Sequence, residues 1–170
     1  RPSSNRPIPP PTYRLSSAGL DAPAIVIRGN DIDVDLSGVE LVGSAEGTAP
    51  DRFAGVAILV DGGERVTIRN ARIRGYKVGI LARGVTGLRL SGNDVSHNWK
   101  QRLYSRVESE SLVDWMSYHN NEKDEWLRYG AGIYLAGITN ARIEGNRAVQ
   151  GQNGLMITRL NVLPFIGTLG

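Results

Sequence analysis

The side chains best suited to chemistry gather in one window of the sequence, residues 97–129. Both histidines and all three tryptophans lie here, among many charged residues. Carboxylates, an imidazole and an amine can exchange protons with a substrate, and the candidate catalytic residues are Asp114, His119, Lys123, Asp124 and Glu125. Aromatic rings stack on the apolar faces of sugars and cations bind sugar carboxylates, so the candidate substrate-binding residues are Trp99, Lys100, Arg102, Tyr104, Trp115, Tyr118, Trp126 and Arg128.

The same window also has a structural interpretation, and both stay open at this point. The three tryptophans could form a small second core, and His97 follows a strand pattern, which favours a corner residue over a ligand. Asp124 and Glu125 stand three or four residues before Arg128, a spacing typical of ion pairs within a helix. We expect short helical segments over residues 106–116 and 121–127, because few helix-breaking residues interrupt them.

The sequence around the window repeats itself. Residues 79–93 match residues 132–146 at a fixed offset of 53, with glycine, isoleucine, threonine, arginine and asparagine in identical places. Glycines that begin similar segments stand at positions 55, 79, 132 and 154, so two spacings are 24 and 22 residues. The third spacing is 53 residues, which equals one repeat plus an insert of about 30 residues. Fixed-period similarity is typical of a repeat architecture.

The elements that must position the window are short strands. Residues 31–36 alternate aspartate with Ile32, Val34 and Leu36, the period-two pattern of a half-buried strand. Each repeat holds two or three such strands separated by glycine or asparagine, with no room for a helix between them. Stacked coils would bury the apolar side of every strand, and glycine and asparagine suit corners with left-handed backbone. We expect Asn93 and Asn146 to stack at equivalent corners.

The repeats resemble those of right-handed parallel β-helix proteins of the pectate-lyase-like superfamily. The segments that carry the resemblance are residues 66–70, 88–93 and 141–146, and the match covers roughly residues 24–158. The resemblance implies an all-β solenoid of about five coils, a right-handed parallel β-helix with one polar and aromatic insert. We expect an extended or disordered proline-rich leader over residues 1–23, the β-helix over 24–159 with its insert at 97–129, and a tail or cap over 160–170. A fragment of a longer β-helix is the alternative to a capped one.

The resemblance also implies a class of activity. It predicts a carbohydrate-active protein with a polysaccharide partner, as a lyase or epimerase acting on an acidic polysaccharide. Lyases of this superfamily use an arginine or lysine base, often with calcium held by carboxylates. The Asn-x-Asp, Asp-Asp and Gly-His-Gly pieces expected of polygalacturonases are not found, which lowers a hydrolase prediction. The alternative is a non-catalytic β-helix module that binds glycans or serves a structural role.

Composition excludes several other classes. The net charge is +3 and the arginines are scattered along the repeats, so nucleic acid is not an expected partner. There is no cysteine, which excludes disulfides and cysteine-based zinc sites. No apolar run is long enough to cross a bilayer. Asp31, Asp33 and Asp35 alternate on one strand and either bind calcium or form a solvated face. We expect the protein to be secreted or periplasmic.

Overall fold

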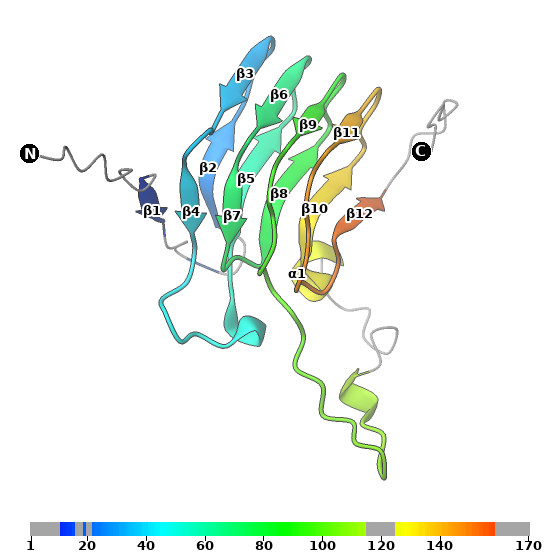
Figure 1. The fold of residues 1–170 in the computed structure, drawn as a ribbon. Helices are drawn as coiled ribbons and strands as arrows, with labels where there is room; N and C mark the ends of the chain where they lie inside the picture. Colours follow the sequence, from blue (N-terminus) through cyan, green and yellow to red (C-terminus); the bar gives the residue numbers. More distant parts are fainter. Residues whose placement is uncertain (1–10, 16–18, 20–21, 115–124, 159–170) are drawn as a thin grey trace, which may run out of the picture.

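The computed structural model describes residues 11–15, 19, 22–114 and 125–158, and their strands form three parallel sheets (Figure 1). The first sheet contains β2 (Pro23–Ile27), β5 (Val56–Asp61), β8 (Val78–Arg83), β10 (Ala131–Ala136) and β12 (Leu155–Thr158). The second contains β3 (Ile32–Asp35), β6 (Val66–Arg69), β9 (Arg89–Ser91) and β11 (Arg142–Glu144). The third contains β1 (Thr12–Arg14), β4 (Glu40–Val42) and β7 (Arg72–Arg74).

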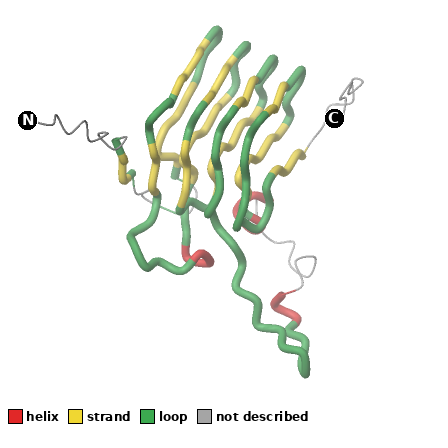
Figure 2. The backbone as a smooth tube through the Cα atoms, viewed as in Figure 1, coloured by secondary structure: helices red, strands yellow, loops and turns green. Residues whose placement is uncertain are grey.

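The chain visits the sheets in turn, so each circuit is one coil of a solenoid. β2, β3 and β4 form the first coil, and β5, β6 and β7 form the second. The third and fourth coils begin with β8 and β10, continue with β9 and β11, and meet the third side at the bridge between Asp94 and Arg147. β12 starts a fifth coil. Strands and connecting loops alternate around the stack (Figure 2), which confirms the predicted all-β solenoid of about five coils.

The register confirms the offset of 53 and corrects one detail of the repeat. Ile58 pairs with Ile80, Ile80 with Ile133, and Ile133 with Leu155. Because Val56 pairs with Val78, the equivalent of Gly79 in the preceding coil is Ala57 and not Gly55. That coil is therefore 22 residues long rather than 24. A Cβ atom on Gly79 would lie 2.6 Å from the Gly132 carbonyl oxygen, so this row needs glycine where the third and fourth coils meet.

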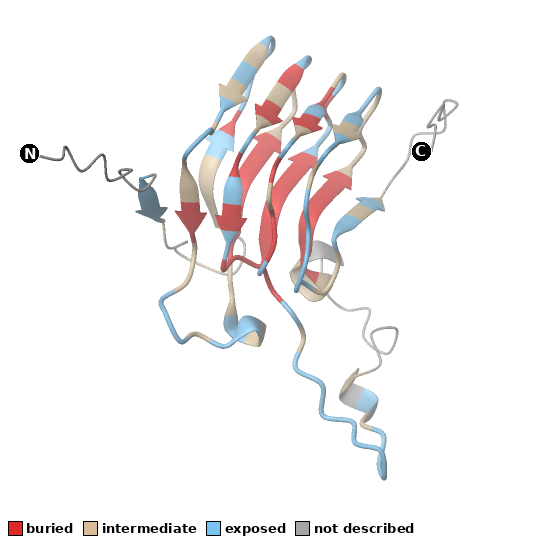
Figure 3. Ribbon diagram, in the orientation of Figure 1, coloured by how far each residue is buried: buried red, intermediate tan, exposed pale blue. Residues whose placement is uncertain are grey.

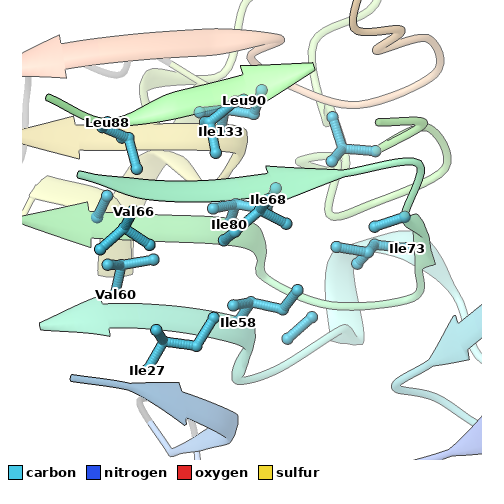
Figure 4. Packing of buried hydrophobic residues seen from close by; sticks show 14 of the residues in the cluster. Ile27, Ile58, Val60, Val66, Ile68, Ile73, Ile80, Leu88, Leu90 and Ile133 are labelled. Atoms are coloured by element: carbon cyan, nitrogen blue, oxygen red, sulfur yellow. The ribbon is translucent and has the colours of Figure 1, made fainter. Parts of the chain in front are cut away.

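The core lies inside the coils (Figure 3). Ile58, Ile80 and Ile133 stack from coil to coil, and Ile27 stacks on Val60, beside Val66 and Ile68 of the second sheet (Figure 4). Burial alternates along β6, as the period-two pattern predicts. Ile32, Val34 and Leu36 pack on the same cluster while the aspartates between them face water, as predicted. The core is thus a continuous apolar column that neighbouring coils share.

Asparagine side chains hold the corner between the second and third sheets. Asn93 is fully buried, and its Oδ1 accepts the backbone N–H of Ala71 at 3.0 Å. Its Nδ2 donates to the carbonyl of Ile68 at 3.0 Å and to Oδ1 of Asn146 at 2.9 Å. The predicted stacking of Asn93 and Asn146 is therefore confirmed. Gly92 and Gly145 precede them with φ of 63° and 61°, the left-handed backbone that these corners require.

Candidate functional site

The insert leaves the coils later than expected. The N–H of His97 still bonds the Val149 carbonyl, and the N–H of Trp99 bonds the Tyr76 carbonyl, both at 2.8 Å. The next residue, Lys100, is exposed, and the chain then runs away from the stack (Figure 1). Residues 97–99 therefore belong to the third coil and not to the insert. His97 has a φ of 57°, which confirms its interpretation as a corner residue.

Trp99 anchors the insert where it leaves the coil. Its side chain is only 9% exposed, and its Nε1 donates to the Asp51 carbonyl at 3.1 Å, which ties the insert to the loop after β4. The Lys77 Nζ lies 3.2 Å from the Trp99 ring centroid and donates to the Arg128 carbonyl at the other end of the insert. A Cβ atom on Gly130 would lie 2.8 Å from the same ring. Burial thus corrects the prediction that Trp99 stacks on a sugar.

The outgoing arm of the insert is exposed and not helical. Lys100, Arg102 and Tyr104 all face solvent, with the Arg102 guanidinium 5.5 Å from the Tyr104 ring centroid. Arg106 and Ser109 bond each other across a tight turn, and a single 3₁₀ turn covers Leu112–Asp114. The helix predicted over residues 106–116 is therefore wrong for the part that the structure describes. The backbone N–H and carbonyl groups of this turn bond each other locally, which replaces the hydrogen bonds that a helix would supply.

Asp114 is held as a hydrogen-bond acceptor for the arm. Its carboxylate accepts the backbone N–H groups of Tyr104 at 2.9 Å and Ser105 at 2.5 Å. A hydrogen bond from the Ser105 side chain is the main cause that lowers the pKa of Asp114 below its ordinary value, and the backbone N–H groups of Tyr104 and Ser105 lower it further. A general acid needs the opposite shift. Asp114 therefore fits a turn-stabilising role better than a catalytic one.

The other predicted site residues are only partly placed. Trp115, Tyr118, His119, Lys123 and Asp124 lie outside the described residues. Glu125 and Trp126 open the helix α1 (Glu125–Tyr129), close to the turn predicted over 121–127. Arg128 is half-buried, with its guanidinium 5.4 Å from the Tyr129 ring centroid. Among the described residues, the predicted catalytic and binding side chains are not brought together around one point.

The coil face beside the insert is apolar. Val56, Leu59, Val78, Leu81, Ala131 and Tyr134 form a second buried cluster, and Leu127 of α1 packs against it. The side chains of this cluster are buried, so they do not present an open surface to a polymer. At the edge of this sheet, Asp61 accepts from Arg28 at 2.8 Å and from Arg83 at 2.7 Å.

Asp61 should make stability depend on acidic pH. Hydrogen bonds from Arg83 and Arg28 lower the pKa of Asp61 from its ordinary 3.8 to about 2. A lowered carboxyl pKa adds stability above the unfolded-state value, and this contribution is lost as pH falls from about 4 to 2. Both arginines are mostly exposed, so Asp61→Asn should cost only about 1 kcal/mol at pH 7 and little at pH 2. Urea unfolding at both pH values measures this, with the exposed Glu46→Gln as control. An equal cost at both pH values would contradict the assignment.

An open groove lies at the corner between the second and third sheets, away from the insert. This corner groove has a volume of about 640 Å³ and crosses four coils. Small residues leave room in it, and polar side chains surround it; it is lined by Ser37, Gly38, Asn70, Ala71, Arg72, Gly92, Asn93, Asp94, Gly145 and Arg147. Sequence analysis missed this site. The sequence feature that could have revealed the groove is the repeat offset of 53 residues, because the same offset places Asp94 opposite Arg147.

Charges of both signs line the corner groove. Arg72, Asp94 and Arg147 lie in one row across neighbouring coils, and Arg147 Nη1 is 3.1 Å from Asp94 Oδ2. Burial alone would raise the pKa of Asp94, but hydrogen bonds from Ser96 and Arg147 outweigh it and lower the pKa. Asp94 is therefore a carboxylate at neutral pH. Arg72 is exposed and makes no ion pair with any residue that the structure describes.

The aspartate row on β3 pairs with arginines of the next coil. Arg65 binds Asp31 at 2.5 Å, and Arg69 lies 3.1 Å from Asp33 and 3.3 Å from Asp35. A calcium ion would have to displace these guanidinium groups, so the residues present do not fit calcium. Among the described residues no three histidine, aspartate or glutamate side chains gather as metal ligands. The aspartates form a solvated row of ion pairs.

Comparison with known proteins identifies the family. The family described as "right handed beta helix region" matches residues 55–163, which is more than half of the chain. The protein belongs to the right-handed β-helix family. No curated protein and no solved structure matches it. The right-handed β-helix is a fold of the carbohydrate-active type. The family match names neither a substrate nor a reaction. Within the described part of this β-helix, no helix has the length and apolar character needed to cross a membrane.

Proposed function

We propose that this β-helix is a glycan-binding module that holds a linear acidic polysaccharide in the corner groove. One observation carries the proposal: an open hollow crosses four coils and is lined by the exposed residues Arg72 and Arg147. A groove along a solenoid meets an extended polymer at a new coil every ~4.8 Å. Guanidinium groups bind carboxylates through paired hydrogen bonds.

Binding is better supported than catalysis at the residues that the structure describes. Asp114 is occupied by backbone N–H groups, and the face beside the insert is apolar. A lyase or epimerase is the second candidate, because lyases of the resembling superfamily use an arginine base and Arg72 is exposed in the groove. A lyase would release an unsaturated product from a bound polymer. Absorbance of such a product, followed with and without calcium, separates the two candidates.

The direct test is binding to a polysaccharide panel. We expect at least one of hyaluronan, polygalacturonate and alginate to bind in isothermal titration calorimetry, and a neutral glucan to bind far less. Arg72→Ala and Arg147→Ala should each weaken the tightest binder about tenfold, since a charge-assisted hydrogen bond contributes ~1.5–3 kcal/mol. Arg89→Ala is the matched control, because Arg89 is exposed on the second sheet but outside the groove. Equal losses in all three variants would contradict the groove.

The proposed ligand class also bears on location. Acidic polysaccharides are polymers of cell surfaces and extracellular matrices. We therefore propose that the protein acts in a secreted or periplasmic setting. Cell fractionation of the native protein tests this, and recovery in the cytoplasmic fraction alone would contradict it.

A further inference from the structure

We propose that the corner groove selects an alternating polysaccharide, in which an acidic sugar alternates with an uncharged one. This inference rests on the proposed glycan-binding function and goes beyond it, because it specifies the charge pattern of the ligand. It is carried by the order of charges along the groove and by their spacing, which the strand register fixes.

The charges follow one row with one residue per coil. Glu40 pairs with Arg72, Arg72 with Asp94, and Asp94 with Arg147. Charge therefore alternates from coil to coil. Glu40 lies outside the groove lining and its carboxylate binds Arg74 at 3.0 Å. The groove itself thus presents a cation, an anion and a cation on three successive coils.

The spacing of this row suits a sugar chain. Neighbouring parallel strands are ~4.8 Å apart, so Arg72 and Arg147 are separated by ~9.6 Å along the row. One pyranose in an extended chain advances by a length similar to one strand spacing, so successive sugars would lie beside successive coils. An acidic sugar beside Arg72 then places its neighbour beside Asp94 and the next acidic sugar beside Arg147.

Asp94 supplies the selection against a sugar acid at the middle position. A homopolymer of uronates would bring a carboxylate against the Asp94 carboxylate, and like charges brought together at an interface cost binding energy. An uncharged sugar would instead offer hydroxyl or amide N–H donors to the same oxygen atoms. Arg147 already shares its charge with Asp94 at 3.1 Å, so the groove has less positive charge than a surface built for uniform polyanions.

The floor of the groove allows a polysaccharide to approach its charged side chains. Gly92 and Gly145 are exposed at the corner, and Asn93 is fully buried beneath it. A Cβ atom on Gly145 would meet no atom closer than 3.8 Å, so the space above Gly145 is open, whereas the Asn70 Oδ1 would lie 3.0 Å from a Cβ atom on Gly92. A sugar can therefore approach Arg147 directly over Gly145, with Asn70 beside it over Gly92.

The experiment compares three polymers of matched length on the full chain by calorimetry. Hyaluronan alternates uronate with an uncharged N-acetylated sugar, polygalacturonate has a uronate at every position, and a neutral glucan has none. We expect hyaluronan to bind at least tenfold more tightly than polygalacturonate. Asp94→Asn should narrow this ratio several-fold by improving polygalacturonate binding. The asparagine keeps an Oδ1 acceptor for the Ser96 N–H, and thermal unfolding checks that the variant is folded.

Glu144→Gln is the matched control, because Glu144 is an exposed carboxylate of the second sheet that pairs with Arg142 outside the groove. It should leave the ratio unchanged. Polygalacturonate binding as tightly as hyaluronan overturns the inference and leaves the proposed function standing. A ratio that Asp94→Asn does not change also overturns it. Binding of no acidic polymer above the neutral glucan overturns the proposed function itself.

Discussion

Trp99→Ala should lower the free energy of unfolding by about 3–5 kcal/mol, the usual cost of removing a buried tryptophan from a packed site. The indole is nearly buried, covers Lys77 and Gly130, and donates to the Asp51 carbonyl. Removing it leaves a cavity where both ends of the insert and the loop after β4 meet. The midpoint of urea unfolding measures the loss. Trp99→Phe should cost less, because a ring still covers Lys77, although part of the indole volume and the N–H donor are lost.

Tyr104→Ala is the control for this prediction. Tyr104 is also an aromatic residue of the window, but its side chain is about half exposed, with the exposed Arg102 guanidinium 5.5 Å from its ring centroid. We expect a change within about 0.5 kcal/mol, as for other exposed positions. If Trp99→Ala proved as mild as Tyr104→Ala, the tryptophan would not anchor the insert.

Asn93→Ala should cost about 3 kcal/mol through lost hydrogen bonds at a buried corner. The N–H of Ala71 and the carbonyl of Ile68 would lose a partner where water does not reach, at about 1–3 kcal/mol for each unsatisfied group. Asn146 is only half-buried, so Asn146→Ala should cost about half as much. Chemical denaturation of the two variants measures the difference.

The control for the asparagine corner is Asn70→Gly. The Asn70 side chain donates to the exposed residues Asp35 and Ser37, and Asn70 has a φ of 60° that glycine adopts without strain. We expect a change within about 0.5 kcal/mol. A loss for Asn70→Gly equal to that for Asn93→Ala would contradict the assignment of the larger stabilisation to the buried amide of Asn93.

The fold could be predicted because its rules are local and repeated. Alternation in Ile32, Val34 and Leu36 identifies a strand and its inward face, and the repeat places Asn93 and Asn146 at equivalent corners. The exact coil length needed the structure. Gly55 resembles the start of a coil in sequence, yet hydrogen bonding places Ala57 opposite Gly79 because only pairing defines register.

The site was harder to predict because its contacts join distant residues. Trp99 looks like an exposed aromatic until Lys77, Asp51 and Gly130 are brought around it. Asp114 looks like a free carboxylate until Tyr104 and Ser105 donate to it. The corner groove comes from the angle between two sheets, and no single segment contains it. His119, Lys123 and their neighbours stay predictions.

The uneven lengths of chain between paired coils have a consequence for assembly of the molecule. In the first sheet, successive pairings close loops of 33, 22, 53 and 22 residues. Closing 53 residues instead of 22 costs ~0.8 kcal/mol more in chain entropy. The interface between β8 and β10 carries the largest such cost, and Trp99 with Lys77 holds the base of that loop closed. The contact between Trp99 and Lys77 thus reduces the length of chain that must be closed when β10 pairs with β8. The fourth coil can therefore pack on the third despite the insert between them.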